Sequence, residues 1–308
     1  MIARRTAGRV QPIYAGVDGG GTRCRALLAD ARGVELGAGS AGPANPFQDP
    51  RQAAASVVEA VEAALSDAGC APSEIGNVVA CVGLAGANVK SAYERMVDWD
   101  HPFCDMQLTT DVEIACLGAH GGLDGGVVVV GTGSSGCALV DGEWHYLGGY
   151  GFPFADKGSG AWFGLEAIRA VLLDFDELGP PTALRGALRE ETGFGPLELV
   201  DFMSGARPAR FASIAPLVVD AAGNGDAVAA GILRDGSAYL SDLVVRLVAF
   251  GAPAVALVGG LSGKLLPWLG EDAAARVVPA QKSAEHGALL SAMHSGEAQT
   301  RERGAGDS

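Results

Sequence analysis

Apolar residues occur in short runs along the first third of the chain, and each run is bounded by glycine or by charged residues. Runs of this length predict strands at residues 13–18, 23–29, 34–39, 77–84 and 107–109. Between them, apolar side chains repeat at helical spacing and predict helices at residues 52–68, 91–99 and 113–119. The first part of the chain therefore has the order β-β-β-α-β-α-β-α.

The same pattern restarts in the second part of the chain. Apolar runs predict strands at residues 126–130, 136–140, 143–147 and 254–258. Helical spacing predicts helices at residues 159–173, 181–191, 196–203, 208–221, 225–250 and 284–293. Both parts open with an apolar strand, a Gly/Ser/Thr-rich turn and a hairpin. The architecture therefore repeats, although the sequence does not.

A chain of 308 residues is longer than one compact core usually allows, so two domains are expected. We place them at residues 12–112 and 113–295, with flexible tails at residues 1–11 and 296–308. The last predicted helix could also pack back on the first domain. The predicted fold class is α/β, because strands and helices alternate in both parts.

Composition and charge argue against several classes of function. Apolar residues make up 48% of the chain and charged residues 19%, which is typical of a globular protein. The net charge of −14 argues against a role at nucleic acid or at a membrane surface. The longest apolar stretch, residues 243–261, is interrupted by Arg246, Gly251 and Pro253, so it does not read as a membrane span. Residues 1–9 lack the apolar core of a secretory signal, and we expect a cytoplasmic protein.

The cysteines show no metal-binding spacing. None forms a C-x-x-C pair, and no histidine lies at ligand distance along the chain. We therefore expect neither a zinc site nor an Fe–S cluster from this chain alone. Most of the six cysteines lie in apolar segments, where a free thiol packs as a small apolar side chain; they are Cys24, Cys70, Cys81, Cys104, Cys116 and Cys137.

A glycine-rich turn between the first two predicted strands is the strongest chemical signal. It reads Asp18-Gly19-Gly20-Gly21-Thr22, an acidic residue and a threonine around three glycines. Glycines let backbone N–H groups approach an anion, the threonine hydroxyl can donate to phosphate, and Asp18 can orient a hydrated Mg²⁺. An ordinary tight hairpin is the alternative. The turn is not a Walker loop, because no Gly-Lys-Ser/Thr follows. It is also not the dinucleotide-binding fingerprint, because the predicted element after it is a strand rather than a helix.

A second turn repeats this chemistry at the start of the second part. The run Val127–Val130 leads into Gly131-Thr132-Gly133-Ser134, whose N–H and hydroxyl groups can also hold phosphate oxygens. Near the end of the chain, a strand finishes at Gly259 and Gly260, which would permit close approach of adenine and ribose. A plain hairpin and a glycine helix cap are the respective alternatives.

Three further positions are candidates for sugar chemistry. Asp111 follows a predicted strand, where a carboxylate could accept a proton from an alcohol that attacks a γ-phosphate. A helix N-cap at Asp111 is an equally good explanation. The run 148–160 combines glycines and aromatic residues with Asp156, which suits a sugar ring. Asn45, in a Gly-Pro turn, could reach a ligand or serve the turn alone.

These motifs occur in the order found in one known set of proteins, and the resemblance covers roughly residues 13–292. The chain resembles the sugar-kinase/Hsp70/actin superfamily and, within it, the BadF/BadG/BcrA/BcrD ATPase family, in its bacterial glucosamine and N-acetylglucosamine kinase branch. The segments that carry the closer match are His101-Pro102-Phe103, Thr110-Asp111, residues 115–120 and Phe152-Pro153.

The resemblance implies two ribonuclease-H-like, actin-like ATPase domains around a nucleotide cleft. It implies transfer of the γ-phosphate of Mg-ATP to the 6-hydroxyl of an amino sugar, with Asp111 as general base and Asp18 near the metal. The remaining implied contacts are phosphate at Gly19, Gly20, Gly21, Thr22, Thr132, Gly133 and Ser134, adenosine at Gly259 and Gly260, and sugar hydroxyls at Asn45 and Asp156. Homodimers are common in this superfamily.

Two departures flank the expected sugar pocket. Lys157 stands where relatives often have Glu, and Gly149-Tyr150-Gly151 replaces Gly-Trp-Gly. Lys157 could favour an anionic sugar or point to solvent, so glucosamine, N-acetylglucosamine and N-acetylmuramic acid all remain open as substrates.

Two other classes of protein are also considered: an ATPase activator of a dehydratase, which would hold an Fe–S cluster, and a sugar sensor without catalysis. The sensor is disfavoured because Asp18, Asp111 and both glycine turns are present.

Overall fold

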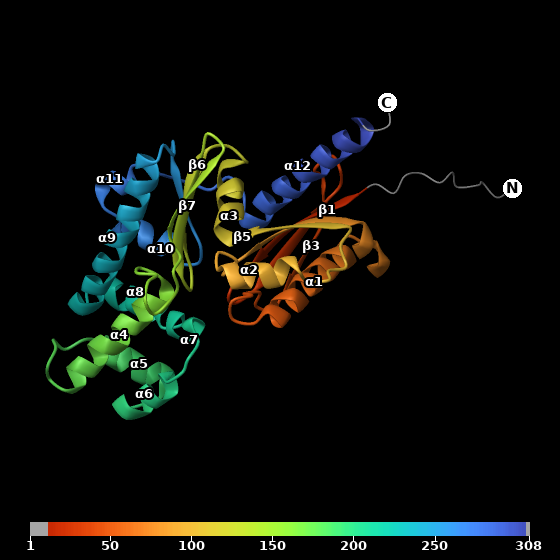
Figure 1. The fold of residues 1–308 in the computed structure, drawn as a ribbon. Helices are drawn as coiled ribbons and strands as arrows, with labels where there is room; N and C mark the ends of the chain where they lie inside the picture. Colours follow the sequence, from red (N-terminus) through yellow and green to blue (C-terminus); the bar gives the residue numbers. More distant parts are fainter. Residues whose placement is uncertain (1–11, 306–308) are drawn as a thin grey trace. The chain divides into compact units, whose positions relative to one another are not determined.

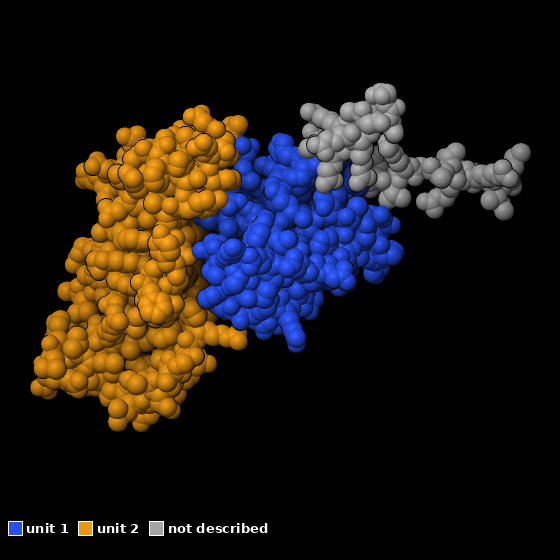
Figure 2. Space-filling model, in the orientation of Figure 1, with its two compact units in different colours: residues 1–122, 281–308 blue, residues 123–280 orange. Residues whose placement is uncertain are grey.

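The computed structural model describes the backbone of residues 12–305 and the side chains of residues 12–295. The chain forms two compact units, one of residues 1–122 and 281–308 and the other of residues 123–280 (Figure 2). The expected tail 1–11 lies outside the described residues, as do residues 306–308. The last helix continues to Ala305, so the segment expected as a tail from residue 296 is helical up to that point.

Unit 1 is built on a five-stranded sheet of order β3-β2-β1-β4-β5. The first three strands form an antiparallel meander, and β1, β4 and β5 run parallel. The strands are β1 (Ile13–Gly19), β2 (Cys24–Ala29), β3 (Glu35–Ala41), β4 (Val78–Leu84) and β5 (Asp105–Thr110). The helices of this unit are α1 (Pro50–Asp67), the 3₁₀ helix η1 (Pro72–Asn77), α2 (Lys90–Val97), α3 (Asp111–His120) and α12 (Ala284–Ala305).

Alternation along the strands gives this sheet two apolar faces. Ala15 and Val17 of β1 pack in a cluster with α1, whereas Tyr14 packs with Leu289 of α12 on the opposite face. Figure 1 shows α1 and α12 on these two faces of the sheet. The helix α12 therefore covers the first strand, in agreement with the expectation that the last predicted helix could pack back on the first domain. Unit 1 also includes α3, although the sequence placed the boundary at residue 112.

Unit 2 repeats the sheet in the order β10-β9-β6-β7-β8. Its strands are β6 (Gly125–Val130), β7 (Ser134–Val140), β8 (Glu143–Gly148), β9 (Val255–Val258) and β10 (Val277–Val278). Its helices are α4 (Gly160–Phe175), α5 (Leu184–Thr192), α6 (Pro196–Met203), α7 (Pro208–Ala212), α8 (Ala215–Gly223), α9 (Ala227–Ala249), α10 (Ser262–Leu265), the 3₁₀ helix η2 (Leu266–Trp268) and α11 (Glu271–Ala274).

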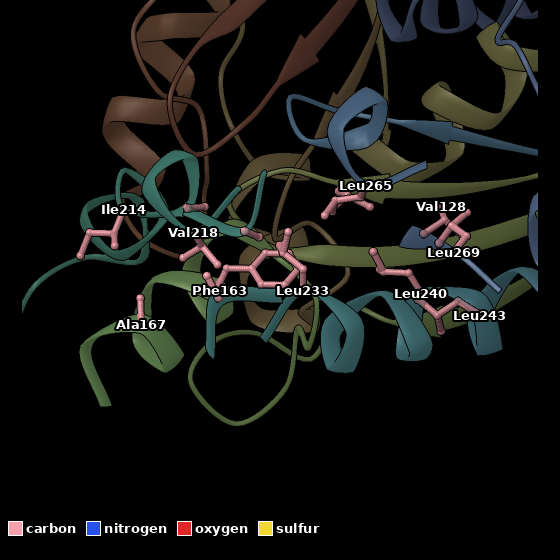
Figure 3. Close-up of a cluster of buried hydrophobic side chains, with 14 of the residues drawn as sticks. Val128, Phe163, Ala167, Ile214, Val218, Leu233, Leu240, Leu243, Leu265 and Leu269 are labelled. Atoms are coloured by element: carbon pink, nitrogen blue, oxygen red, sulfur yellow. The ribbon is translucent and has the colours of Figure 1, made fainter. Parts of the chain in front are cut away.

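The core of unit 2 lies between its sheet and the long helix α9. Phe163 of α4 and Leu233 and Leu240 of α9 are fully buried there, and Val128 of β6 belongs to the same cluster (Figure 3). This core fixes the ends of β6 and α4, which carry the glycine turn of the unit.

The two sheets have the same topology: a three-stranded antiparallel meander is extended by two parallel strands. The α/β class with two ribonuclease-H-like domains is therefore confirmed. Among the described residues, no helix combines the length and the apolar character that a membrane crossing needs.

Candidate functional site

The predicted residues of unit 1 meet at one edge of its sheet. The parallel register aligns Gly19 of β1 with Leu84 of β4 and with Thr110 of β5, so the carboxyl ends of three strands lie side by side. Two backbone hydrogen bonds join the loops at this edge: Ala44 N–H donates to Gly20 O at 2.8 Å, and Ala85 N–H donates to Gly19 O at 2.8 Å. The glycine turn, the Asn45 turn and the start of α3 are thus brought together.

The glycine turn is tight and open to solvent at its tip. Gly20 N–H donates to Arg23 O at 2.9 Å, which closes the hairpin. A Cβ on Gly21 would meet no atom within 4 Å, and Thr22 is exposed. The Gly21 N–H and the Thr22 hydroxyl are therefore accessible to an anion.

Asp18 is the second-to-last residue of β1 and lies beside an arginine. Arg25 Nη2 of β2 donates to Asp18 Oδ2 at 2.7 Å, and Glu285 Oε2 of α12 lies 3.6 Å from the same nitrogen. Burial raises the pKa of Asp18, while the hydrogen bond and charge of Arg25 oppose this effect. One carboxylate oxygen is thus held by Arg25, and Oδ1 remains for another ligand.

Asp111 occupies the first position of α3 and is half-buried. The N-cap of α3 is Thr110, whose hydroxyl accepts from Glu113 N–H at 3.3 Å, so the N-cap explanation of Asp111 is wrong. Burial and then the negative charge of Asp18 raise the pKa of Asp111 to about 7, although N–H groups at the helix start lower it. A carboxylate with this pKa can take up a proton near neutral pH.

Asn45 serves its own turn. Its Oδ1 accepts from Phe47 N–H at 3.0 Å and from Gln48 N–H at 3.2 Å. Gly86 packs against it so closely that a Cβ there would lie 2.6 Å from Asn45 Oδ1. The amide oxygen of Asn45 is therefore used within the turn, and the NH₂ group is the part of the side chain that can donate to a ligand.

The second glycine turn is held by the start of α4. Gly160 N–H donates to Gly131 O at 2.9 Å, and Ala161 N–H donates to Thr132 O at 3.2 Å. Gly131 N–H donates to Gly133 O at 3.0 Å within the turn. These bonds fix the backbone of Thr132 and Gly133 at the carboxyl end of β6.

Ser134 and Asp156 have internal partners beside this turn. The Ser134 hydroxyl donates to Lys157 O at 2.9 Å. Asp156 is buried at a φ of +61°, and its carboxylate accepts from the N–H groups of Gly151, Phe152 and Ser134. Asp156 thus organises the loop from 148 to 158, and burial raises its pKa. Gly133 is required here, because a Cβ would lie 2.6 Å from Asp156 Oδ2.

The rest of the 148–158 loop is open. Gly148, Gly149 and Gly151 adopt positive φ angles, and the Tyr150 side chain is 83% exposed. Lys157 is bound in the other direction: its Nζ lies 2.7 Å from Asp235 Oδ1 of α9 and 5.7 Å from the ring centre of Trp162. The positive charge of Lys157 is therefore already paired.

Gly259 and Gly260 lie next to the second turn. The parallel register pairs Val258 with Val129, so both glycines follow the end of β9 beside the end of β6. Gly259 has a φ of +103°, and a Cβ there would lie 2.4 Å from Val130 O. Gly260 is exposed, with no atom within 4 Å of a Cβ position. The two predicted nucleotide segments of unit 2 are therefore brought together.

Sequence reasoning missed the charged partners Arg25, Glu285 and Asp235. Arg25 carried a weak signal, because it lies in an otherwise apolar predicted strand and next to the glycine turn. The two acidic residues lie far from their partners in the sequence, and only the packing of α12 and α9 brings them close.

The chain is similar over most of its length to known amino-sugar kinases. It is 33% identical over 277 residues to glucosamine kinase GspK of Vibrio cholerae, which covers 90% of this chain and 94% of that protein. It is 27% identical to an N-acetyl-D-glucosamine kinase of Dictyostelium discoideum, over 77% of this chain and 79% of that protein. A solved structure from Chromobacterium violaceum, assigned as an N-acetylglucosamine kinase, superimposes with a TM-score of 0.84 at 32% identity, covering 92% of this chain and 99% of that one.

The sequence model of one family matches nearly the whole folded part, from residue 15 to residue 292. This range includes both glycine turns, Asp111 and the Gly259–Gly260 pair, and it ends in α12. The chain therefore belongs to the BadF/BadG/BcrA/BcrD ATPase family.

Proposed function

We propose that this protein is an ATP-dependent amino-sugar kinase that transfers the γ-phosphate of Mg-ATP to the 6-hydroxyl of glucosamine or N-acetylglucosamine. The observation that carries the proposal is Asp111, a half-buried carboxylate beside the first glycine turn whose pKa is raised to about 7. The similarity to GspK and to an N-acetyl-D-glucosamine kinase supports the same activity. The proposal keeps the cytoplasmic location expected from the sequence.

The nucleotide is assigned to the glycine segments. Gly19, Gly20, Gly21 and Thr22 bind phosphate oxygens through N–H groups and a hydroxyl, and Thr132 and Gly133 do so in unit 2. Ser134 acts by shaping its turn, since its hydroxyl and N–H are used internally. Adenosine is assigned to Gly259 and Gly260, and Gly260 leaves open space for it, since a Cβ there would meet no atom within 4 Å.

Mg²⁺ fits at Asp18. Protein sites for Mg²⁺ typically use one or two carboxylates plus phosphate oxygens and water. Asp18 offers one carboxylate oxygen that no hydrogen bond among the described residues uses, next to the turn proposed for phosphate. When bound, the metal supplies charge neutralisation for the phosphates.

The sugar hydroxyl is activated by Asp111. Its carboxylate accepts the proton as the hydroxyl oxygen attacks the γ-phosphate, which avoids an oxonium product. Asn45, Gly149 and Tyr150 are proposed to position the sugar, the first through its NH₂ group. Asp156 acts on the sugar mainly through the loop that it holds, because three N–H groups already surround its carboxylate.

The substrate is proposed to be an uncharged or cationic amino sugar. An anionic substituent, as in N-acetylmuramic acid, needs an unpaired cation nearby. Lys157, the residue that could have supplied it, is paired with Asp235 at 2.7 Å. This pairing favours glucosamine and N-acetylglucosamine over the anionic alternative.

A coupled ATPase assay over a panel of amino sugars tests the proposal. We expect ATP consumption only when glucosamine or N-acetylglucosamine is present. Asp111→Asn should lower kcat by about 10²–10⁴-fold, because general-base catalysis is worth that much. The affinity for ADP should stay nearly unchanged. A variant that turns over at near wild-type rate would remove Asp111 from the role of base.

A further inference from the structure

Three charged side chains from distant parts of the chain converge behind the first glycine turn. Asp18 lies on β1, Arg25 on β2 and Glu285 in the first turn of α12. Their side chains are 18%, 41% and 16% exposed, respectively. The proposed reaction uses only Asp18, so the other two require an explanation.

Arg25 lies between the two carboxylates but closer to Asp18 than to Glu285. Its Nη2 is 2.7 Å from Asp18 Oδ2, which is a charge-assisted hydrogen bond. The same nitrogen is 3.6 Å from Glu285 Oε2, and that oxygen is buried without a hydrogen-bond partner. A buried carboxylate oxygen without a hydrogen-bond partner is costly, so its presence at this position calls for a compensating role.

Counting charges indicates that role. Asp18 and Arg25 alone would form a neutral pair, whereas Glu285 brings the trio to a net charge of −1. Glu285 Oε2 lies 3.6 Å from the same Arg25 nitrogen that binds Asp18, so its negative charge acts on the Asp18 site. In a partly buried site such charges interact strongly, because the local dielectric is far below that of water.

We propose that Glu285 is a positioning residue that keeps the Asp18 site negative enough for a divalent cation, by sharing Arg25 with Asp18. This inference rests on the proposed function, in which Asp18 holds Mg²⁺ beside the nucleotide phosphates. The last helix of the chain thereby sets the cation affinity of a turn that follows the first strand.

The test measures how much Mg²⁺ tightens ADP binding. ADP is titrated calorimetrically into the full-length protein, once with Mg²⁺ and once with EDTA. The Mg²⁺-dependent gain is the ratio of the Kd measured with EDTA to the Kd measured with Mg²⁺. Glu285→Gln makes the trio neutral and should reduce the Mg²⁺-dependent gain by about tenfold, given the strength of charge interactions in such sites. Arg25→Met makes it −2 and should increase the gain.

The double variant makes the test sharper. Arg25→Met with Glu285→Gln restores a net charge of −1, so its Mg²⁺-dependent gain should return close to that of the wild type. The expected order of gains is Arg25→Met, then wild type and double variant together, then Glu285→Gln. A purely structural role for Glu285 would instead weaken ADP binding with and without Mg²⁺ alike.

Glu35→Gln is the matched control. Glu35 Oε1 lies 3.1 Å from His286 Nε2, so this change removes a carboxylate next to the same turn of α12 without touching Arg25. It should leave the ratio unchanged. Thermal unfolding establishes that each variant is folded, and if Glu285→Gln does not fold, the opposite sign expected for Arg25→Met still decides.

Two outcomes overturn the inference. One is an unchanged ratio in folded Glu285→Gln, and the other is a reduced ratio in Arg25→Met. The kinase proposal fails separately, because the ADP titration needs no sugar, whereas the kinase proposal requires sugar-dependent ATP consumption by the wild type. A wild-type protein that binds ADP equally with and without Mg²⁺ would remove the premise that Asp18 holds the cation.

Discussion

Asp111 connects the pH dependence of activity with that of stability. Because burial raises the pKa of Asp111 in the folded protein from its ordinary value of 3.8 to about 7, the folded state still holds a proton between these pH values that the unfolded state has lost. Stability should therefore fall as pH rises from about 4 to about 7. A base must be unprotonated, so kcat/KM should rise with pH up to about 7 and then level off.

Asp111→Asn separates the two effects. It removes the buried charge, so the gain in Tm over wild type should be larger at pH 8 than at pH 5. The acid limb of the kcat/KM profile should disappear in the residual activity. Differential scanning calorimetry at the two pH values measures the first effect, and an equal gain in Tm at both would show that Asp111 is not the group with the raised pKa.

The neighbouring glycines Gly259 and Gly260 should respond differently to alanine. At Gly259 the positive φ and the 2.4 Å approach to Val130 O make alanine strained, and we expect a loss of roughly 1–3 kcal/mol. At Gly260 a Cβ meets open space, so stability should change by less than about 0.5 kcal/mol. If Gly260 faces adenosine, Gly260→Ala should still weaken ADP binding. Urea unfolding and ADP titration separate the two effects, and normal ADP affinity in Gly260→Ala would place adenosine elsewhere.

At the scale of elements, α12 is held against α3 and β1 by backbone contact. A Cβ on Gly287 would lie 1.9 Å from Ile114 O of α3, and one on Gly16 would lie 2.0 Å from Glu285 O. Gly287→Ala should therefore destabilise the protein by about 3 kcal/mol through overpacking. Gly231→Ala in α9 is the matched control: nothing lies within 4 Å, and alanine should stabilise that helix by roughly 0.5–1 kcal/mol. Equal effects in urea unfolding would contradict this view of the α3–α12 contact.

The sequence predicted best those strands and helices that are long enough to show a repeating pattern of apolar residues. The strands 13–18 and 77–84 and the helix 52–68 fall on β1, β4 and α1. The two-residue strand β10 and the four-residue helices α10 and α11 are too short to show one. The predicted helix 208–221 is instead split into α7 and α8, because Pro216 lacks the N–H that would bond to Ala212 O.

The positions of the candidate site residues in the fold were predictable where a glycine or carboxylate follows directly after a strand. Asp18, Gly21 and Asp111 all lie at the carboxyl edge of one sheet, as glycine and carboxylate residues after apolar runs indicated. The internal partners of Ser134 and Asp156 depend on how one loop folds over β7, which no spacing encodes. The same limit applies to Arg25 and Glu285.

For the molecule as a whole, the cysteines provide a test against the dehydratase-activator class. Burial raises the pKa of Cys24 and Cys81 to about 12, so these thiols stay protonated and unreactive. Among the described residues, no group of three or more His, Cys, Asp or Glu side chains is arranged to hold a metal ion. Protein purified without oxygen should contain no stoichiometric iron. Stoichiometric iron and acid-labile sulfide would overturn the kinase proposal in favour of that class.

The chain order of unit 1 has a consequence for biosynthesis. Tyr14 and Leu27 pack with Ala288 and Leu289 of α12, which the ribosome makes after residues 123–280. Residues 123–280 emerge as one continuous unit before then. The apolar face of the β1–β5 sheet that contacts α12 therefore stays exposed until α12 has been synthesised. Nonsense or frameshift products that stop after residue 280 should consequently be captured by chaperones or degraded, even though they contain both glycine turns.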